Sequence, residues 1–91
     1  MMQRKHIQVF GTVQGVGFRH HTELIAKKLD IFGTVQNVED YVDIYAQGDE
    51  EKIKSFINKV IAGASPASSV SDYSIEDLDV TNRYSEFKTI Y

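Results

Sequence analysis

Residues 11–19 read Gly-Thr-Val-Gln-Gly-Val-Gly-Phe-Arg, and the rest of the sequence is arranged around this stretch. It lies between an alternating, strand-like run and a run with helical spacing that begins near His20. Glycine permits positive φ, and successive N–H groups before a helix form a concavity that binds anions. Arg19 can complete such a site with a bidentate fork. We therefore predict an oxyanion cradle suited to a phosphoryl group; the alternative is a glycine-rich turn that only reverses the chain.

A sequence of 91 residues, 42% of them hydrophobic, is large enough for one core, so we predict a single domain over residues 1–91. The net charge of −3 argues against a nucleic-acid partner and favours a small anionic ligand. Cysteine is absent, which excludes disulfides, thiolate nucleophiles and thiolate metal ligands and suits a reducing compartment. Because the sequence has no apolar leader and no run of membrane-spanning length, we expect a soluble, cytoplasmic protein without a membrane partner.

The first half of the sequence predicts a strand, a helix and a hairpin. Alternation over residues 5–13 predicts a half-buried strand, and helical spacing predicts a helix over about residues 20–30 with Gly33 at its exit. The apolar stripe of this helix contains Phe18, Thr22, Ile25, Ala26, Leu29 and Phe32. Gly33–Val38 and Tyr41–Gln47 then predict two antiparallel strands, because a link over residues 37–40 is short enough for a hairpin.

The second half predicts another helix and two strands. Asp49 is the expected N-cap of the helix, which has Glu50 and Glu51 in its first turn and stops at Gly63. Its apolar stripe contains Ile53, Phe56, Ile57, Val60 and Ile61. Residues 70–80 predict a strand with a bulge or bend, because the alternation changes parity within it. A turn over residues 81–85 precedes a final strand over residues 86–91.

The order of these elements predicts the fold class. It is β-α-β-β-α-β with a C-terminal fifth strand, which is typical of the split-βαβ or ferredoxin-like architecture. We therefore expect an α+β, two-layer sandwich in which both helices cover one face of an antiparallel sheet.

Several motifs of phosphate binding and catalysis do not fit these residues. A dinucleotide-binding fingerprint needs a third glycine, a Walker loop needs Lys followed by Ser or Thr, and a cysteine-phosphatase loop needs cysteine. No serine occupies a sharp strand-to-helix turn. His20 and His21 are adjacent and point about 100° apart on a helix, so they cannot chelate one ion and we predict no metal site. His6 is expected on the surface of the first strand.

A cradle with an arginine and no nearby nucleophile can still catalyse attack by water on a weak bond. Acyl phosphates meet this condition because their leaving group is a carboxylate, and phosphoryl transfer depends mainly on positioning and charge stabilisation. The remaining requirement is a group that orients water, and a side-chain amide suits it because it both donates and accepts hydrogen bonds. Asn37 is the candidate; the alternative is an asparagine that only forms the turn.

These residues closely resemble the signature of the acylphosphatase family. Residues 11–19 resemble its first motif, and residues 33–37, Gly-Thr-Val-Gln-Asn, resemble its second. Residues 46–49, Ala-Gln-Gly-Asp, resemble the strand end before the second helix, and residues 87–91 resemble the closing strand. The likeness covers essentially the whole chain, and its first motif is highly specific.

The resemblance implies an acylphosphatase, which hydrolyses a small acyl phosphate to a carboxylate and inorganic phosphate without metal, cofactor or phosphoenzyme. It also implies that Arg19 binds the phosphate together with loop amides and that Asn37 positions the attacking water, so these two residues are the predicted catalytic residues. The predicted phosphate-binding residues are Gln14, Gly15, Val16, Gly17, Phe18 and Arg19. We expect a monomer whose partner is its small-molecule substrate.

Three positions depart from the family pattern. Thr12 stands where many members carry a basic residue, Thr34 replaces a common aromatic residue, and Tyr41 occupies a hairpin position where glycine is frequent, which leaves the turn type open. The alternative function is a non-catalytic phosphate-binding or protein-interaction module, because a fold alone does not fix function. Similar domains also occur within larger hydrogenase-maturation proteins. No specificity pocket can be read from the sequence.

Overall fold

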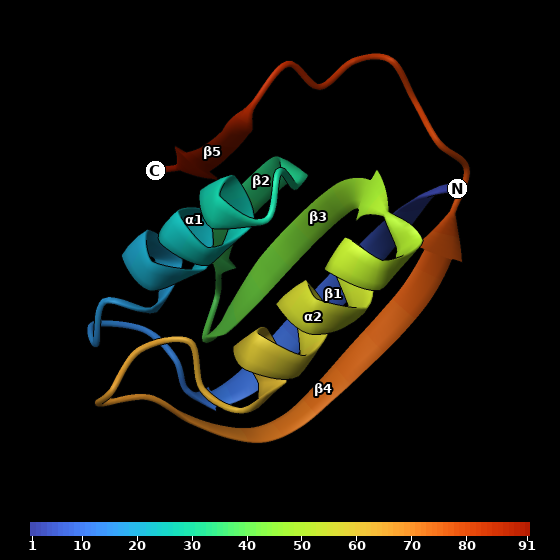
Figure 1. Cartoon of the computed structure of the whole chain (residues 1–91). Coiled ribbons are helices and arrows are strands. Elements are labelled where there is room, and N and C mark those ends of the chain that lie inside the picture. The colour runs from blue at the N-terminus through green and yellow to red at the C-terminus, as the bar shows by residue number, and fades with distance from the viewer.

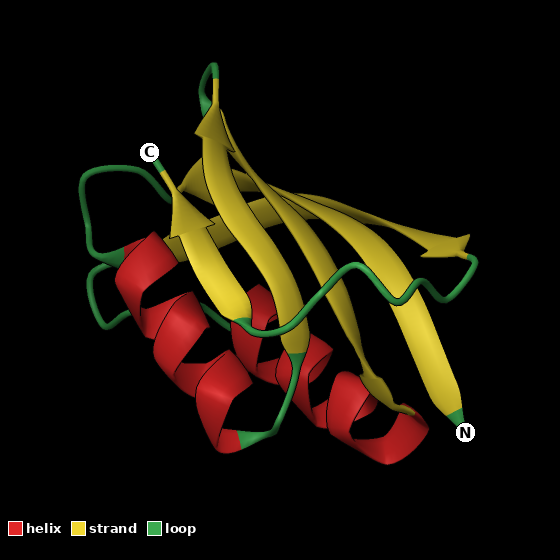
Figure 2. Cartoon of the chain, turned by 90° about the horizontal axis from the view of Figure 1, so that it is seen from above, coloured by secondary structure: helices red, strands yellow, loops and turns green.

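The computed structural model describes residues 1–91 and contains five strands and two helices (Figure 1). In chain order they are β1 (Met2–Thr12), α1 (Phe18–Lys28), β2 (Phe32–Val38), β3 (Tyr41–Asp49), α2 (Glu50–Ile61), β4 (Ser69–Leu78) and β5 (Phe87–Ile90). Both helices lie on the same face of the sheet (Figure 2). The predicted order of elements and the two-layer architecture are therefore confirmed.

The sheet is mixed, so the prediction of an antiparallel sheet is wrong in one pairing. The strand order is β4-β1-β3-β2-β5, and β5 pairs with β2 in parallel while the other three pairs are antiparallel. β4 and β5 lie at opposite edges, and residues 79–86 connect them across the structure (Figure 1). This crossover brings Phe87 beside Gly33 near the start of β2, and the two strands then run in the same direction.

The hydrophobic core lies between the sheet and the two helices. On α2, Ile53, Phe56 and Val60 are fully buried as predicted. The Phe56 ring packs against Phe87 with the ring centroids 5.9 Å apart, which holds the start of β5 in the core. Burial of one side chain of this size contributes about 1.5–3 kcal/mol. The remaining core residues are Ile7, Val9, Val13, Phe18, Ala26, Ile31, Val35, Val42, Ile44 and Ala46.

α1 begins and ends two residues earlier than predicted, and its end has a clear physical cause. Asp30 adopts a positive φ of 55°. The Ile31 N–H donates to the Ala26 carbonyl at 2.8 Å, and the Asp30 N–H donates to Lys27 at 3.4 Å. These are the two hydrogen bonds of a Schellman motif, which stops the helix before Phe32. Phe32 therefore belongs to β2 and not to the helical stripe.

α2 begins where the sequence predicts. The Asp49 side chain accepts a hydrogen bond from the Glu51 N–H at 3.3 Å, and Glu50 and Glu51 occupy the first turn. The helix ends at Ile61, two residues before Gly63. Acidic residues in the first turn complement the positive end of the helix dipole, so local sequence fixes this boundary.

The hairpin and the predicted bulge both form, and the hairpin turn is shorter than expected. β2 reaches Val38 and β3 starts at Tyr41, which leaves only Glu39 and Asp40 in the turn. Glu39 has a positive φ of 53°, whereas Tyr41 lies in the strand with its ring 5.2 Å from that of Phe10. The register of β1 and β4 shifts so that Ser71 is the additional residue, and the predicted bulge is confirmed.

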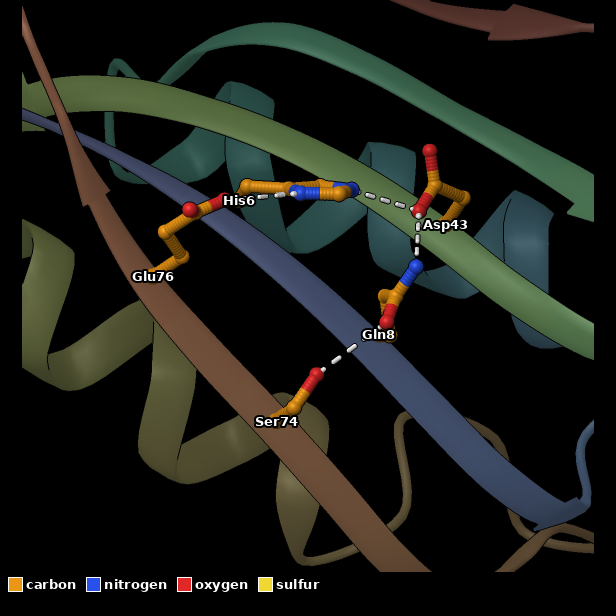
Figure 3. Close-up of polar contacts among 5 residues, drawn as sticks. All are labelled: His6, Gln8, Asp43, Ser74 and Glu76. Carbon is orange, nitrogen blue, oxygen red and sulfur yellow. Dashed lines mark hydrogen bonds and ion pairs between the residues drawn. The ribbon is translucent and has the colours of Figure 1, made fainter.

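The face of the sheet away from the helices carries a cluster of polar side chains (Figure 3). His6 Nε2 lies 2.6 Å from Asp43 Oδ1 on β3, and His6 Nδ1 lies 3.5 Å from Glu76 on β4. Gln8 donates to the same Asp43 oxygen at 3.4 Å and accepts from Ser74 at 3.3 Å. The His6 side chain is only 18% exposed, so it links three strands rather than standing free on the surface.

Two side chains hold the crossover between β4 and β5. Gln47 donates to the Thr81 carbonyl at 2.8 Å and accepts from the Thr81 N–H at 2.9 Å. Arg4 Nε donates to the Tyr84 hydroxyl at 3.1 Å, and its guanidinium lies 5.5 Å from the centroid of the same ring. These contacts fix the path that delivers β5 to its place beside β2. Neither helix of the fold is long and apolar enough to cross a bilayer.

Candidate active site

A pocket of about 150 Å³ lies where the β1–α1 loop meets the end of β2 and the residue after β5. It brings together Arg19 and Asn37, which belong to different elements. Pockets for drug-sized ligands occupy about 300–1,000 Å³, so this one suits a smaller ligand. The lining residues are Val13, Gln14, Gly15, Gly17, Phe18, Arg19, His20, Asn37 and Tyr91.

The loop between β1 and α1 has the backbone geometry of an anion cradle. Gly15 and Gly17 adopt φ values of 73° and 76°, a region that side chains with a Cβ rarely occupy. The residues from Gln14 to Gly17 lie outside the helices and strands, and their N–H groups donate none of the backbone hydrogen bonds of the turns and loops. Gly17 is the N-cap of α1, where no side chain caps the helix and no acidic residue occupies the first turn. The positive end of this helix is therefore free for an anion.

Two side chains brace the cradle. Gln14 donates from its amide nitrogen to the carbonyls of Glu39 at 3.0 Å and Tyr41 at 2.9 Å, which ties the loop to the β2–β3 hairpin. His21 Nδ1 lies 2.9 Å from the Gly17 carbonyl. Val16 does not line the pocket, because its side chain packs against the hydrophobic core. The loop is thus held from both sides, with its glycines toward the pocket.

Arg19 stands at the start of α1 without an acidic partner. None of the ion pairs of the structure involves it, and no carboxylate side chain lines the pocket. Its Nη1 donates one long hydrogen bond of 3.4 Å to the Ile90 carbonyl, and the Tyr91 ring centroid lies 4.9 Å from its guanidinium carbon. The other donors of the guanidinium are free to bind an anion.

Asn37 lies on β2 opposite Val42, one residue before the strand ends. Its side-chain oxygen is buried and has no hydrogen-bond partner in the protein. A buried polar atom without a partner is uncommon and calls for an explanation. Asn37 lines the same pocket as Arg19, so its side-chain amide lies beside the space in which a ligand would bind.

Three residues that line the pocket, Val13, His20 and Tyr91, are not among the predicted site residues. The sequence predicts His20 as an ordinary residue at the start of the helix, although its position next to Arg19 is a signal for a residue of the site. Tyr91 had no local signal, because it reaches Arg19 only through the parallel pairing of β5 with β2. No group of three His, Cys, Asp or Glu residues is arranged to hold a metal ion.

The three departures from the family pattern lie outside the lining of the pocket. Thr12 ends β1 opposite Ser69. Thr34 pairs with Tyr45 and Lys88 inside the sheet, and Tyr41 begins β3. None of the three lines the pocket, so the geometry around Arg19 and Asn37 does not depend directly on them.

The fold and the site together define a ferredoxin-like protein with a small pocket that is suited to an anion. The model of the family Acylphosphatase matches residues 5–89. An acylphosphatase from Staphylococcus haemolyticus is 57% identical over 98% of this chain and its own full length, and one from Staphylococcus aureus is 55% identical over the same shares. This chain belongs to the acylphosphatase family, so the predicted family and enzyme class are confirmed at that level.

Solved structures agree with this assignment. The crystal structure of acylphosphatase from Bacillus subtilis aligns over all of both chains with a TM-score of 0.92 and 37% identity. Full-length HypF, in its phosphate- and nucleotide-bound form, aligns with a TM-score of 0.91 and 31% identity, and the match covers 12% of that chain. The same domain therefore occurs both as a small protein and as one part of a larger one.

Proposed function

We propose that this protein hydrolyses the carboxyl–phosphate bond of small acyl phosphates, with Arg19 and Asn37 as its catalytic residues. Family membership supports the reaction. The pocket supports the roles, because it joins a free cation, unpaired loop N–H groups and a buried amide oxygen in about 150 Å³. A ligand with a small anionic head matches this combination of charge and size.

The phosphoryl group binds first in this scheme. The N–H groups of the loop from Gln14 to Phe18 and the N-terminus of α1 surround its oxygens, and Arg19 contributes a fork of charged donors. The same donors stabilise the charge that spreads over the phosphoryl oxygens in the transition state. The protein thus supplies positioning and charge, which is most of what phosphoryl transfer requires.

Hydrolysis then proceeds by direct attack of water. The Asn37 amide oxygen accepts a hydrogen bond from the water and so orients the lone pair of the water oxygen toward phosphorus. A new P–O bond forms as the bond between phosphorus and the acyl oxygen breaks, and the carboxylate leaves with the electron pair. Both hydrogens of the water end on the phosphate product. A carboxylate is a stable leaving group, so the reaction needs no strong general acid.

The observation that carries this proposal is that Asn37, whose side-chain oxygen has no partner in the protein, lines the pocket of Arg19. Its test is benzoyl phosphate hydrolysis with EDTA present, together with titration of inorganic phosphate. Arg19→Gln should lose both phosphate binding and turnover. Asn37→Ala should lose turnover by about 10²–10³-fold, the effect of one positioned hydrogen-bonding group, while phosphate binding persists.

Arg83→Gln is the matched control, because Arg83 is an exposed arginine outside the pocket. It should behave like the wild type in both assays. Equal loss of phosphate binding in Asn37→Ala would refute the separate roles of the two residues. Saturable phosphate binding without turnover in the folded wild type would instead support a non-catalytic binding module.

We also propose that the protein acts in the cytoplasm as a monomer and needs no cofactor. A sequence without cysteine suits a reducing compartment. The proposed chemistry uses only side chains and backbone groups that a single chain supplies. Full activity at protein concentrations far below any self-association would support the monomer.

A further inference from the structure

α1 is hydrogen-bonded to β5 through the carboxylate of Glu23, one helical turn after Arg19. Glu23 Oε1 accepts two hydrogen bonds from Thr89, one from its backbone N–H at 2.9 Å and one from its hydroxyl at 2.8 Å. The second oxygen of Glu23 lies 3.3 Å from Lys27 Nζ. The Glu23 side chain is only 24% exposed. The hydrogen bond from the Thr89 hydroxyl lowers the pKa of the Glu23 carboxyl below its usual value and outweighs burial, which raises it. The carboxyl is therefore charged at neutral pH.

The Glu23–Thr89 link lies next to the contacts that Arg19 makes with Ile90 and Tyr91. Arg19 and Glu23 are four residues apart on α1, and residues with this spacing share one face of a helix. Thr89 is followed directly by Ile90, whose carbonyl accepts from Arg19, and by Tyr91, whose ring lies over the guanidinium. The Glu23–Thr89 link therefore sets where the end of β5 meets Arg19.

β5 has few other anchors near this end. It is an edge strand of four residues that pairs only with β2. Its buried anchor, Phe87, lies at the opposite end of the strand, and the backbone bond from Gly33 to Glu86 lies there as well. Thr89 and Ile90 pair with Val35 and Gln36 of β2, and the Glu23–Thr89 link adds an anchor from α1 at this end, next to Tyr91, which lies beyond the paired residues.

We infer that Glu23 is a positioning residue for Arg19, acting through Thr89 and the end of β5. The inference rests on the proposed function only in assigning the phosphate to Arg19. The Tyr91 ring and the Ile90 carbonyl restrict the guanidinium before the substrate arrives, so less conformational entropy is lost on binding. The long bond to Ile90 can be exchanged for a bond to a phosphate oxygen at small cost, because only one weak hydrogen bond is given up.

Such a role has a distinct kinetic signature. A more mobile Arg19 binds phosphate less well in the ground state and in the transition state alike, which raises KM and leaves kcat almost unchanged. We expect Glu23→Ala to weaken the binding of inorganic phosphate and to raise the KM for benzoyl phosphate by about three- to tenfold, the scale of one net hydrogen bond. Its kcat should stay within about twofold of the wild type.

Three variants separate positioning from a general structural effect. Glu23→Gln retains an acceptor for Thr89 and should recover most of the phosphate affinity. Thr89→Ser should also keep it, whereas Thr89→Val should weaken it and tests the same link from the strand if Glu23→Ala does not fold. Lys27→Met is the matched control, because it removes the partner of the other Glu23 oxygen and leaves both bonds to Thr89.

The decisive experiment is phosphate titration by calorimetry, with NMR of the Arg19 side chain. The Tyr91 ring 4.9 Å away shifts the Arg19 side-chain protons through its ring current, and Glu23→Ala should remove much of this shift in the folded protein. Unchanged phosphate affinity and proton shifts in Glu23→Ala would overturn the inference, and so would an equal loss of affinity in Lys27→Met. The proposed function fails separately, if the wild type binds phosphate without hydrolysing benzoyl phosphate.

Discussion

At the scale of single residues, Gly17 has two roles. It is the N-cap of α1 and part of the pocket lining, and its φ of 76° lies in the left-handed region. A Cβ at this position would meet His21 no closer than 3.5 Å, which is ordinary contact. The cost of a side chain is therefore conformational rather than steric.

Gly17→Ala should destabilise the fold by about 1–2 kcal/mol, the cost of a left-handed conformation for an L-residue. It should also weaken phosphate binding, because relief of the strain moves the N–H groups of the cradle. Urea unfolding and phosphate titration measure the two effects. Gly15→Ala, with a φ of 73° and open space around the site of a Cβ, should show the same conformational cost. A fully stable Gly17→Ala variant would contradict this account.

The charge of Glu23 makes stability depend on pH. The pKa of this carboxyl is lowered from its ordinary value of 4.5 in the folded state, chiefly by the Thr89 hydroxyl. A lowered pKa stabilises the fold above the unfolded-state value, and this contribution is lost as pH falls through the folded-state value. The difference in unfolding free energy between the wild type and Glu23→Gln should be constant near neutral pH and shrink below about pH 4.5. A difference that persists unchanged into acid would contradict the assignment.

At the scale of elements, β2 depends on one glycine that lies next to β3. Gly33 has a φ of 144°, and a Cβ built there would overlap the Tyr45 carbonyl. Gly33→Ala should destabilise the protein by about 2–4 kcal/mol, because backbone strain adds to the displacement of β3. Urea unfolding measures this loss. The neighbouring Thr34→Ala is the control and should cost much less; similar costs would contradict the steric reason.

The polar cluster on the open face links β1 to both of its neighbouring strands. His6 lies 2.6 Å from Asp43, which is 14% exposed, and 3.5 Å from Glu76, which is 68% exposed. Burial reduces screening by water, so the pair with Asp43 should couple more strongly than the pair with Glu76. Double-mutant cycles with His6→Phe, Asp43→Asn and Glu76→Gln measure both couplings in urea unfolding. Equal coupling energies would contradict this ranking.

At the scale of the whole molecule, the charge of the edge strand β4 affects whether two copies of the chain associate. The edge strand β4 carries exposed Asp72, Glu76 and Asp77, and charged side chains on an edge oppose pairing with another sheet. We therefore expect light scattering to give the mass of one chain, 10.3 kDa, over a wide range of concentration. A mass that doubles on concentration would contradict the monomer, and neutralising Asp72 and Asp77 should then strengthen the association.

Much of the fold could be predicted because it is encoded locally. The helical stripe of Ile53, Phe56 and Val60 and the N-cap at Asp49 specify α2 without distant partners. The end of α1 could not be predicted, because Asp30 adopts a left-handed conformation more typical of glycine or asparagine. Gly33, three residues later, is needed for its approach to Tyr45 and does not end the helix.

The amino-acid sequence by itself determined the order of the elements, the core faces of the two helices and the chemistry of the 11–19 loop. Periodicity and glycine placement act over a few residues, so they can be read without the fold. Only the tertiary structure decided that β5 runs parallel to β2 and brings Tyr91 and Thr89 to α1. The direction of pairing depends on the path of the crossover and on the space left beside β2. No local pattern records either of these, which is why the contacts of Arg19 with Ile90 and Tyr91 were decided by the fold.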